Sequence, residues 1–352
     1  MYYLNPQIEN LFRIFDQNAR KDYLRLDLNE NPGGLPQEFI NEVLSQVDSR
    51  FVAQYPETLQ FTEKLASFLG TDISHLCLTN GSSEGIRYII QAFTSPQGRI
   101  VGVVPSYFMF QIYSEMYDRN FVKVSYNDDL SMDISNILKE ITEETQLLIL
   151  LQPNNPMGNV YTEEEFVTIL RKAQEKQVTV LVDEAYHYFY PGTFIEYALK
   201  GEHVFVTRTF SKLFAMAGCR LGYVVGWPEG IKMVQKLCTP HNTNAFAMAF
   251  AEAIIENPPI LQSLIDNFVE GREFLIDQLE ANGYRYKGEA GNFIFIKTKT
   301  DAERIVTRMK EEKRILIKSY PNVGNFGTCL RVSIGEKKYM EEFFSALLEL
   351  DK

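Results

Sequence analysis

Two basic residues, Lys212 and Arg220, lie in the middle of a largely apolar segment, VFVTRTFSKLFAMAGCRLGYVVG, at positions 204–226. A charge removed from water costs free energy unless it is paired or its pKa is shifted. Both side chains could face solvent from a surface turn. Alternatively, Lys212 is a desolvated amine that acts as a nucleophile. The hydroxyl groups of Thr209 and Ser211, together with Arg220, would then suit an anion beside it.

A carboxylate ends another apolar run, in VTVLVDEAYHYFY at positions 178–190. An acid at the tip of a buried strand, such as Asp183, caps a helix, binds a metal ion or pairs with a cation in a cleft. His187 follows at a spacing that matches no recognised set of metal ligands. We therefore expect no metal site and interpret His187 as a packing or surface residue.

Two further motifs place polar groups where an apolar run ends. In LLILLQPNNPMGNVY (147–161), Pro156 restricts the backbone of Asn155 and so sets the direction of its side chain. In LTNGSSEGIRYIIQAF (78–93), a strand, a Gly-Ser-Ser turn and a helix from about Ser83 would direct several N–H groups toward one point, as in phosphate sites. Each motif by itself is also an ordinary turn. Neither nucleotide-binding motif, GxxxxGK[ST] or GxGxxG, occurs in the chain.

Together these groups match the needs of one cofactor, pyridoxal 5′-phosphate (PLP). An acid can hold a proton on its pyridine nitrogen, and an asparagine and a tyrosine can hydrogen-bond its phenolate oxygen. A lysine can form an imine with its carbonyl carbon, while a helix N-terminus, hydroxyl groups and an arginine can bind its phosphate. We therefore predict a PLP site.

Short apolar runs alternate with amphipathic segments along most of the chain, and these elements must position the site. The clearest amphipathic segment is 163–176, for which Thr162 is the predicted N-cap. The alternation predicts an α/β fold with a mainly parallel seven-stranded sheet sandwiched by helices. The apolar runs lie at 76–79, 99–104, 121–124, 147–151, 178–182, 204–207 and 221–225.

The pattern changes after residues 258–260, where a long helix and then shorter strands and helices predict a smaller α+β domain. We expect three parts. An N-terminal arm, 1–45, packs with the small domain. A large PLP-binding domain spans 46–245, and the small C-terminal domain spans 246–352.

The chain resembles fold-type I PLP enzymes of the class I/II aminotransferases, and it is most similar to their histidinol-phosphate aminotransferase branch. The resemblance covers essentially the whole chain. No single motif is specific, but the order and spacing of the motifs are. They are LDLNENP (26–32), YPE, NGSSEG, PSY, PNNPMG, DEAY, TFSKLFAMAGCRLGY and LRVSIG.

The resemblance implies a role for each matching residue around the cofactor. Lys212 would form a Schiff base with PLP and later shuttle a proton, and Asp183 would pair with the pyridinium nitrogen. Asn155 and Tyr186 would hydrogen-bond the 3′ oxygen of the ring, and Tyr107 would stack on its face. The phosphate would be bound by the backbone amides of Ser82 and Ser83, by Thr209, Ser211 and Arg220, and by Tyr55 of the partner subunit in a homodimer.

The resemblance also implies substrate contacts. Arg331, in LRVS, would bind the substrate α-carboxylate through two parallel hydrogen bonds. Asn29 and Glu30 would lie beside the substrate pocket, near Asn155. Lys318 stands where that branch has a second arginine that helps to bind the substrate's phosphate. A lysine offers a point charge there without the guanidinium fork.

A second departure lies near the N-terminus, where that branch has a substrate-contacting tyrosine and this chain has Phe15 or Asp16. Both departures affect the part of the pocket that reads the substrate side chain. The resemblance implies an aminotransferase that exchanges an amino group between a 2-oxo acid and either an L-amino acid or a histidinol-phosphate-like amino-alcohol phosphate. It leaves the donor open.

Two alternatives share the same cofactor residues. One is a PLP-dependent decarboxylase or lyase of the threonine-phosphate decarboxylase type, in which a different bond of the substrate is held perpendicular to the ring. The other is a non-catalytic PLP-binding regulatory protein. Such a regulator would lack Lys212 or carry an attached DNA-binding region. The sequence contains Lys212 and shows no such region.

Composition limits the classes of binding partner and the cellular compartment that we expect. The 352-residue chain has a net charge of −11 and a pI near 5.1, which argues against nucleic acid or an anionic membrane as the main partner. Neither a signal peptide nor a transmembrane run is recognisable. The four cysteines are scattered, which is typical of proteins with reduced thiols. We expect a cytoplasmic homodimer that acts on small molecules.

Overall fold

The computed structural model describes residues 2–9, 11, 20–288 and 290–352, and its largest element is a seven-stranded sheet. The strands are β2 (Leu76–Thr79), β3 (Arg99–Val104), β4 (Asn120–Ser125), β5 (Thr145–Leu151), β6 (Thr179–Asp183), β7 (Val204–Thr209) and β8 (Gly222–Gly226). Their order is β2-β8-β7-β6-β5-β3-β4. β8 runs antiparallel to both of its neighbours, whereas the pairings from β7 to β4 are parallel. The predicted mainly parallel sheet is confirmed.

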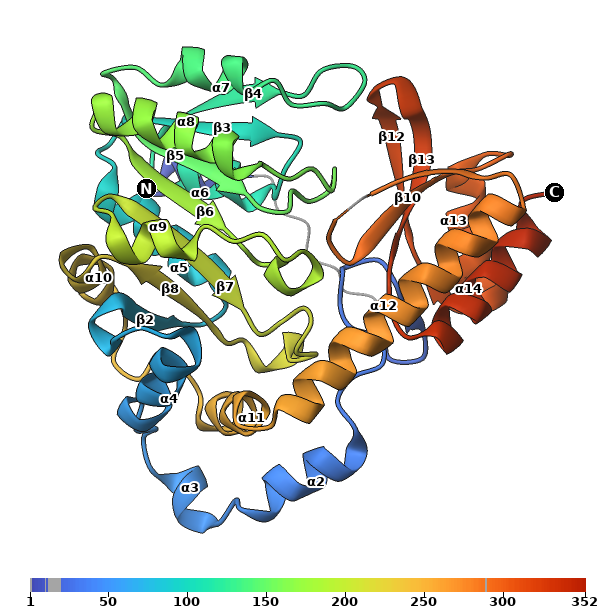
Figure 1. Ribbon diagram of the computed structural model, residues 1–352, viewed down its shortest axis with the longest axis horizontal. Coiled ribbons are helices and arrows are strands. Elements are labelled where there is room, and N and C mark those ends of the chain that lie inside the picture. Colours follow the sequence, from blue (N-terminus) through green and yellow to red (C-terminus); the bar gives the residue numbers. More distant parts are fainter. Residues whose placement is uncertain (1, 10, 12–19, 289) are drawn as a thin grey trace.

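Helices cover both faces of this sheet (Figure 1). One face packs against α4 (Leu59–Leu69), α7 (Ile134–Glu140), α8 (Glu163–Glu175), α9 (Ile195–Lys200) and α11 (Ala245–Ile255). The other face packs against α5 (Ser82–Phe93), α6 (Met109–Met116) and α10 (Pro228–Gln235). Successive residues of β5 alternate between the two cores, with Leu148 in one and Leu147 and Ile149 in the other. Strands buried on both faces accommodate polar side chains mainly near their ends.

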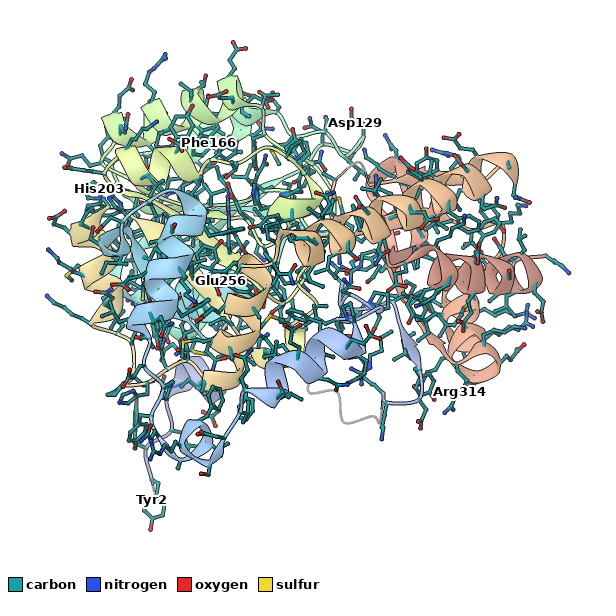
Figure 2. All side chains as sticks on the ribbon, turned by 60° about the horizontal axis from the view of Figure 1, so that its bottom comes forward. Tyr2, Asp129, Phe166, His203, Glu256 and Arg314 are labelled. Carbon is teal, nitrogen blue, oxygen red and sulfur yellow. The ribbon has the colours of Figure 1, made fainter. Side chains whose placement is uncertain are left out.

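The helix predicted at 163–176 is confirmed as α8, with its predicted N-cap. Glu165 N donates to Thr162 Oγ1 at 3.2 Å, and Thr162 N donates to Glu165 Oε2 at 2.8 Å. This reciprocal pair satisfies two N–H groups that a helix start leaves without intrahelical partners. On the inner face of the helix, Phe166 (labelled in Figure 2) stacks on Phe194 with ring centroids 3.8 Å apart.

A smaller domain contains a four-stranded antiparallel sheet in the order β12-β13-β10-β9. Its strands are β9 (Arg285–Lys287), β10 (Phe293–Lys297), β12 (Lys318–Val323) and β13 (Gly327–Ser333). Two short strands, β1 (Leu24–Arg25) and β11 (Ile315–Leu316), form a separate parallel pair. The helices α12 (Pro258–Ala281), α13 (Ala302–Lys313) and α14 (Lys337–Leu350) complete this domain (Figure 1).

The hydrophobic core that the chain packs against changes within α12, whereas the predicted domain boundary follows residue 245. Near the start of α12, Ile260 and Leu261 pack against the core of the large domain. Further along, Leu275 and Leu279 belong to the core of the small domain. The preceding helix α11 packs entirely with the large domain. An amphipathic pattern shows that a helix has a buried face, but it does not show which core that face meets.

The N-terminal segment also contacts both cores, whereas 1–45 was expected to pack with the small domain. Leu26 belongs to the small-domain core. Phe39 and Val43, on α2 (Gln37–Ser45), belong to the core of the large domain. Residues 26–43 therefore connect the two domains.

The remaining elements are short, and they are α1 (Pro6–Glu9), α3 (Ser49–Ala53), η1 (Ile73–His75), η2 (His187–Phe189), η3 (Ala217–Cys219) and η4 (Gly324–Phe326). The loop between β4 and α7 contacts the small domain. Asp129, labelled in Figure 2, accepts a hydrogen bond at its carbonyl oxygen from Lys287 Nζ at 3.0 Å. Asn325 N donates to the carbonyl oxygen of Asp128 at 2.7 Å. Among the described helices, none combines the length and the apolar character needed to cross a membrane.

Gly271 provides a test of how α12 packs on the small domain. A Cβ atom at Gly271 would overlap the carbonyl oxygen of Gly335, in the turn after β13, and would lie 3.1 Å from the carbonyl carbon of Glu336. We predict that Gly271→Ala lowers the free energy of unfolding by at least about 2 kcal/mol, because backbone must move on both sides of the contact. The helix propensity of alanine, worth about 1 kcal/mol, does not compensate.

Chemical denaturation measures this difference. The matched control Glu273→Ala, at an exposed position of the same helix, should change the free energy of unfolding by no more than about 0.5 kcal/mol. A Gly271→Ala variant as stable as the wild type would contradict the close contact between α12 and the turn.

Candidate active site

A cavity of about 580 Å³ lies at the carboxyl ends of the strands of the large sheet and faces the small domain. Its walls come from the start of α5, the ends of β5, β6 and β7, residues 28–30, and strands β12 and β13. Every site residue predicted from the sequence that falls within the described residues lines this cavity, except Tyr55. Phe15 and Asp16 lie outside the described residues.

The start of α5 forms one end of the cavity. Gly81 precedes this helix with a φ of +76°, and a Cβ atom there would lie 2.6 Å from Arg220 Nη2. The guanidinium therefore approaches the helix N-terminus. Arg220 Nη1 donates to Ser211 Oγ at 3.1 Å, and Thr209 Oγ1 donates to the same oxygen at 2.9 Å. A helix start, two hydroxyl groups and a guanidinium meet here, and this combination suits a phosphate.

The Lys212 amine lies in the same cavity, just after β7. Its Nζ donates to the carbonyl oxygen of Leu28 at 3.0 Å. Burial lowers the pKa of Lys212 to about 8, and the positive charges of Arg331 and Arg220 act in the same direction, while the carboxylate of Glu30 opposes them. A lysine in water has a pKa of about 10.4, so the neutral amine is far more abundant here near neutral pH.

Asp183 is the last residue of β6, and only 2% of its surface is exposed. Burial raises the pKa of Asp183 to about 7. Hydrogen bonds from the Thr207 hydroxyl and the Ala185 N–H, each 3.1 Å long, partly oppose this shift. A cation placed beside the carboxyl group would favour its ionised form, and a protonated ring nitrogen is such a cation.

Hydrogen bonds tie two tyrosines of the cavity, Tyr186 and Tyr107, to the surrounding segments. The Tyr186 hydroxyl accepts from Asn29 Nδ2 at 2.9 Å. Asn29 N in turn donates to Ser333 Oγ at 2.9 Å, which connects the N-terminal segment to β13. The Tyr107 hydroxyl lies 3.0 Å from Ser83 Oγ, at the start of α5. Both tyrosine hydroxyls are thereby held in place.

Arg331 reaches the cavity from β13 and is itself 4% exposed. Its Nη1 donates to Asn155 Oδ1 at 2.9 Å, and its Nη2 donates to the Asp27 carbonyl oxygen at 2.6 Å. The guanidinium also lies over the Tyr320 ring, 5.1 Å from its centroid. Arg331 Nε is buried without a hydrogen-bond partner among the described residues. A buried donor of this kind is costly unless a ligand satisfies it, and a carboxylate would do so.

Lys318 is opposite Arg331 across adjacent antiparallel strands, and both side chains line the cavity. Tyr320 and Phe108 line it as well, although neither was among the residues predicted from the sequence. Alternate residues of a strand point to the same face, so the position of Lys318 could have indicated Tyr320. No comparable periodic signal indicates Phe108, which is 64% exposed.

A buried ion pair lies on the opposite face of the strand ends. Glu184 and Arg208 follow Asp183 and Thr207 in sequence, and successive side chains along a strand point to opposite faces. Arg208 Nε and Nη2 donate to Glu184 Oε2 at 3.0 and 2.8 Å, and these two side chains are 5% and 0% exposed, respectively. Arg208 was not predicted from the sequence, although it lies in the same apolar segment as the two basic residues that were. The pair links the ends of β6 and β7. Because Glu184 is adjacent to Asp183 in sequence, this link helps to fix the position of Asp183.

Tyr55 lies outside this cavity. It follows α3, is 78% exposed, and stacks on His241 with ring centroids 4.3 Å apart and an interplanar angle of 14°. Within one chain it therefore contributes nothing to the cavity.

The cavity residues fit PLP. The cradle formed by Gly81 and Arg220 suits its phosphate, and the buried carboxyl of Asp183 suits its ring nitrogen. Within the described part of the chain, no cluster of three or more His, Cys, Asp or Glu side chains is arranged to hold a metal ion.

The family model for aminotransferase class I and II matches residues 21–347 of the chain. Among curated proteins, the chain is 29% identical to a histidinol-phosphate aminotransferase of Caldanaerobacter subterraneus subsp. tengcongensis, over 99% of this chain and 98% of that protein. It is 30% identical to histidinol-phosphate aminotransferase 1 of Carboxydothermus hydrogenoformans, over 93% of each chain.

Among solved structures, the fold is similar to that of histidinol-phosphate aminotransferase from Sinorhizobium meliloti in complex with pyridoxal-5′-phosphate. The TM-score is 0.88 at 22% identity, over 99% of this chain and 98% of that one. This match extends the agreement in fold to both domains.

The low pKa of Lys212 predicts its reactivity toward an acylating reagent. In cofactor-free protein, the rate of Lys212 modification should rise with pH with a midpoint at about pH 8, because only the neutral amine is nucleophilic. In Arg331→Gln, loss of a neighbouring positive charge should stabilise the protonated amine and move the midpoint to higher pH. Mass spectrometry of the peptide that contains Lys212 measures the rate. A midpoint near about 10.4, the value for lysine in water, would contradict the desolvated amine.

Proposed function

The chain belongs to the class I and II aminotransferases, which are PLP-dependent enzymes, and we propose that it transfers an amino group between a 2-oxo acid and either an L-amino acid or an amino-alcohol phosphate. The observation that carries this proposal is that Asp183 at the end of β6, Lys212 just after β7 and Arg331 within β13 line one cavity. The family match favours transfer of the amino group over the decarboxylation that the sequence left open.

We propose that the cavity holds PLP from three directions. Arg220, with the hydroxyl groups of Thr209 and Ser211 and the backbone amides of Ser82 and Ser83, would bind the phosphate. Asp183 would keep a proton on the ring nitrogen. Asn155 and Tyr186 would hydrogen-bond the 3′ oxygen, and Tyr107 would lie against the ring face. When bound, the cofactor supplies a ring that accepts the electrons left at the substrate Cα.

Lys212 would both anchor the cofactor and move a proton. A neutral amine is needed to attack a carbonyl carbon, and burial in this cavity favours the neutral form. After the substrate amine displaces it, Lys212 Nζ would accept the proton from the substrate Cα and later return it. The hydrogen bond from Nζ to the Leu28 carbonyl supports this role, because it keeps the amine at the cavity wall.

Arg331 would bind the α-carboxylate of an amino acid or the equivalent anion of another donor. Asn155 and the Asp27 carbonyl already fix the plane of its guanidinium, so little rotamer freedom remains to be lost on binding. Asn29 and Glu30 would lie beside the substrate. Lys318 would attract a second anionic group on the substrate side chain, such as a carboxylate or a phosphate.

A panel of amino donors tests the substrate class. With a 2-oxo acid acceptor, we expect histidinol phosphate, L-glutamate and L-aspartate to exceed L-leucine in kcat/KM. Lys318→Gln should lower kcat/KM for the anionic donors by about 10- to 100-fold, the value of a charge-assisted hydrogen bond of about 1.5–3 kcal/mol, and should change it little for L-leucine. Lys318→Arg is the matched control that keeps the charge.

Two results would contradict this assignment. Equal losses of kcat/KM for charged and uncharged donors in Lys318→Gln would show that Lys318 does not bind an anionic group of the substrate. Release of carbon dioxide without conversion of the 2-oxo acid would replace transfer by decarboxylation. In either case Lys212→Ala, which lacks the proposed nucleophile, should show no conversion of any donor.

We also propose that the chain is a homodimer in which Tyr55 contacts the cofactor phosphate of the neighbouring subunit. Tyr55 supports this proposal because it is exposed and yet held by its stacking on His241. Val52 and Leu59, close to it in sequence, are 64% and 59% exposed. A dimer contact in this region would cover these exposed apolar side chains.

Subunit mixing tests the dimer. We expect a sedimenting particle of twice the 40.6 kDa chain mass. Tyr55→Ala should weaken PLP binding by about tenfold through loss of a hydrogen bond to a charged group. Mixing it with Lys212→Ala should restore tight binding in hybrid dimers, whose Tyr55→Ala subunits keep Lys212 and gain the partner's Tyr55. A monomeric mass, or no recovery on mixing, would exclude the shared site.

A further inference from the structure

Two cysteine thiols lie in contact outside the lining of this cavity. Cys77 Sγ and Cys238 Sγ are 3.5 Å apart, although the residues are 161 positions apart in sequence. Cys77 belongs to β2 and is 3% exposed, whereas Cys238 follows α10 and is partly accessible. Figure 1 shows α10 beside β2, at the end of the large sheet.

The segment 235–242 runs along the outer edge of β2, which is an edge strand of the sheet. Gln235 Nε2 donates to the Leu76 carbonyl oxygen at 3.2 Å, and Asn242 Nδ2 donates to the Leu78 carbonyl oxygen at 3.0 Å. These side chains donate hydrogen bonds to carbonyl groups with which a further strand could otherwise pair. The Cys77–Cys238 contact lies between these two hydrogen bonds.

The environments of the two thiols differ in a way that suits sequential oxidation. A hydrogen bond with Cys77 lowers the pKa of Cys238, so Cys238 is the better thiolate. The same contact and burial raise the pKa of Cys77. Burial raises the pKa of the other two thiols, Cys219 and Cys329. Cys238 is therefore the thiol best suited to react first with an oxidant.

We propose that Cys77 and Cys238 form an oxidation site at which a peroxide converts the two thiols into a disulfide. The Cys238 thiolate attacks one oxygen of hydrogen peroxide, which forms a sulfenic acid and releases hydroxide. The Cys77 sulfur then attacks the Cys238 sulfur, and the sulfenic hydroxyl leaves as water with the Cys77 proton. The hydroxide from the first step takes up the proton that Cys238 lost on ionisation. Two thiols are thus oxidised, and one peroxide is reduced to two waters. The sulfurs must approach from 3.5 Å to about 2.05 Å.

The disulfide would fasten segment 235–242 to the strand that leads into the turn before α5. Glu84 connects the two, because its Oε2 accepts from Asn80 N at 2.8 Å and from Asn242 Nδ2 at 3.3 Å. His241, in the same segment, stacks on Tyr55. Oxidation would therefore restrain residues 80–83, which are the turn and the first two residues of α5. The significance of that turn for phosphate binding rests on the proposed function, whereas the thiol chemistry does not.

Peptide mapping tests the oxidation site. The holoenzyme is treated with hydrogen peroxide, its remaining thiols are blocked, and it is digested without reduction. We expect one linked peptide pair, containing Cys77 and Cys238, which dithiothreitol separates. The matched control Cys219→Ser should form the same link. Cys77→Ser should instead leave a sulfenic acid on Cys238 that dimedone traps. Absence of the link in the wild type, or links spread over other cysteine pairs, would overturn the proposal.

Amide hydrogen exchange tests the coupling to the turn. In the oxidised wild type, residues 80–83 and 235–242 should exchange at least about threefold more slowly than in the reduced protein. Cys238→Ser should show no change on the same treatment. Unchanged exchange at 80–83 in a protein whose disulfide has been mapped would overturn the coupling. Neither readout depends on amino-group transfer, so failure here is distinguishable from failure of the proposed function.

Discussion

Burial of an acid and an amine in one cavity is the constraint on which the rest of this structure depends. Asp183 ends β6 and Lys212 follows β7. These neighbouring strands are buried on both faces, and burial disfavours the charged form of each group. The fold places both groups at strand ends, where the cavity admits a ligand. On the reverse face, the Glu184–Arg208 pair satisfies its own charges and ties the same strands together. In the proposed function, the charged groups of the cofactor would pair with the cavity groups whose charges the protein alone does not compensate.

The second half of the site depends on how the two domains meet. Arg331 comes from the small sheet, yet its guanidinium is oriented by Asn155 of the large domain and by the carbonyl group of Asp27. Asn29 bonds to Tyr186 on one side and to Ser333 on the other. The proposed substrate end therefore exists only while the N-terminal segment bridges both domains. Substrate specificity in such a site depends on a cavity wall that is assembled from distant parts of the chain.

The edge strand β2 connects the two main proposals. It leads into the turn before α5, where a phosphate would bind, and its outer edge is covered by side-chain hydrogen bonds from segment 235–242. A covered edge protects the sheet from pairing with other chains. Here the cover also carries Cys238 and His241, so its position relative to β2 affects both the thiol contact and Tyr55.

The sequence by itself determined the large sheet, the capped helix α8 and the set of polar residues at strand ends. These features depend on local periodicity and on where an apolar run stops, which a single chain displays directly. Tertiary structure alone decided that Arg208 pairs with Glu184, that Tyr320 and Phe108 join the cavity, and that the core changes within α12. A sequence pattern shows that a side chain will be buried, but its partner depends on which elements pack together. Which elements pack together depends on contacts between residues far apart in the chain.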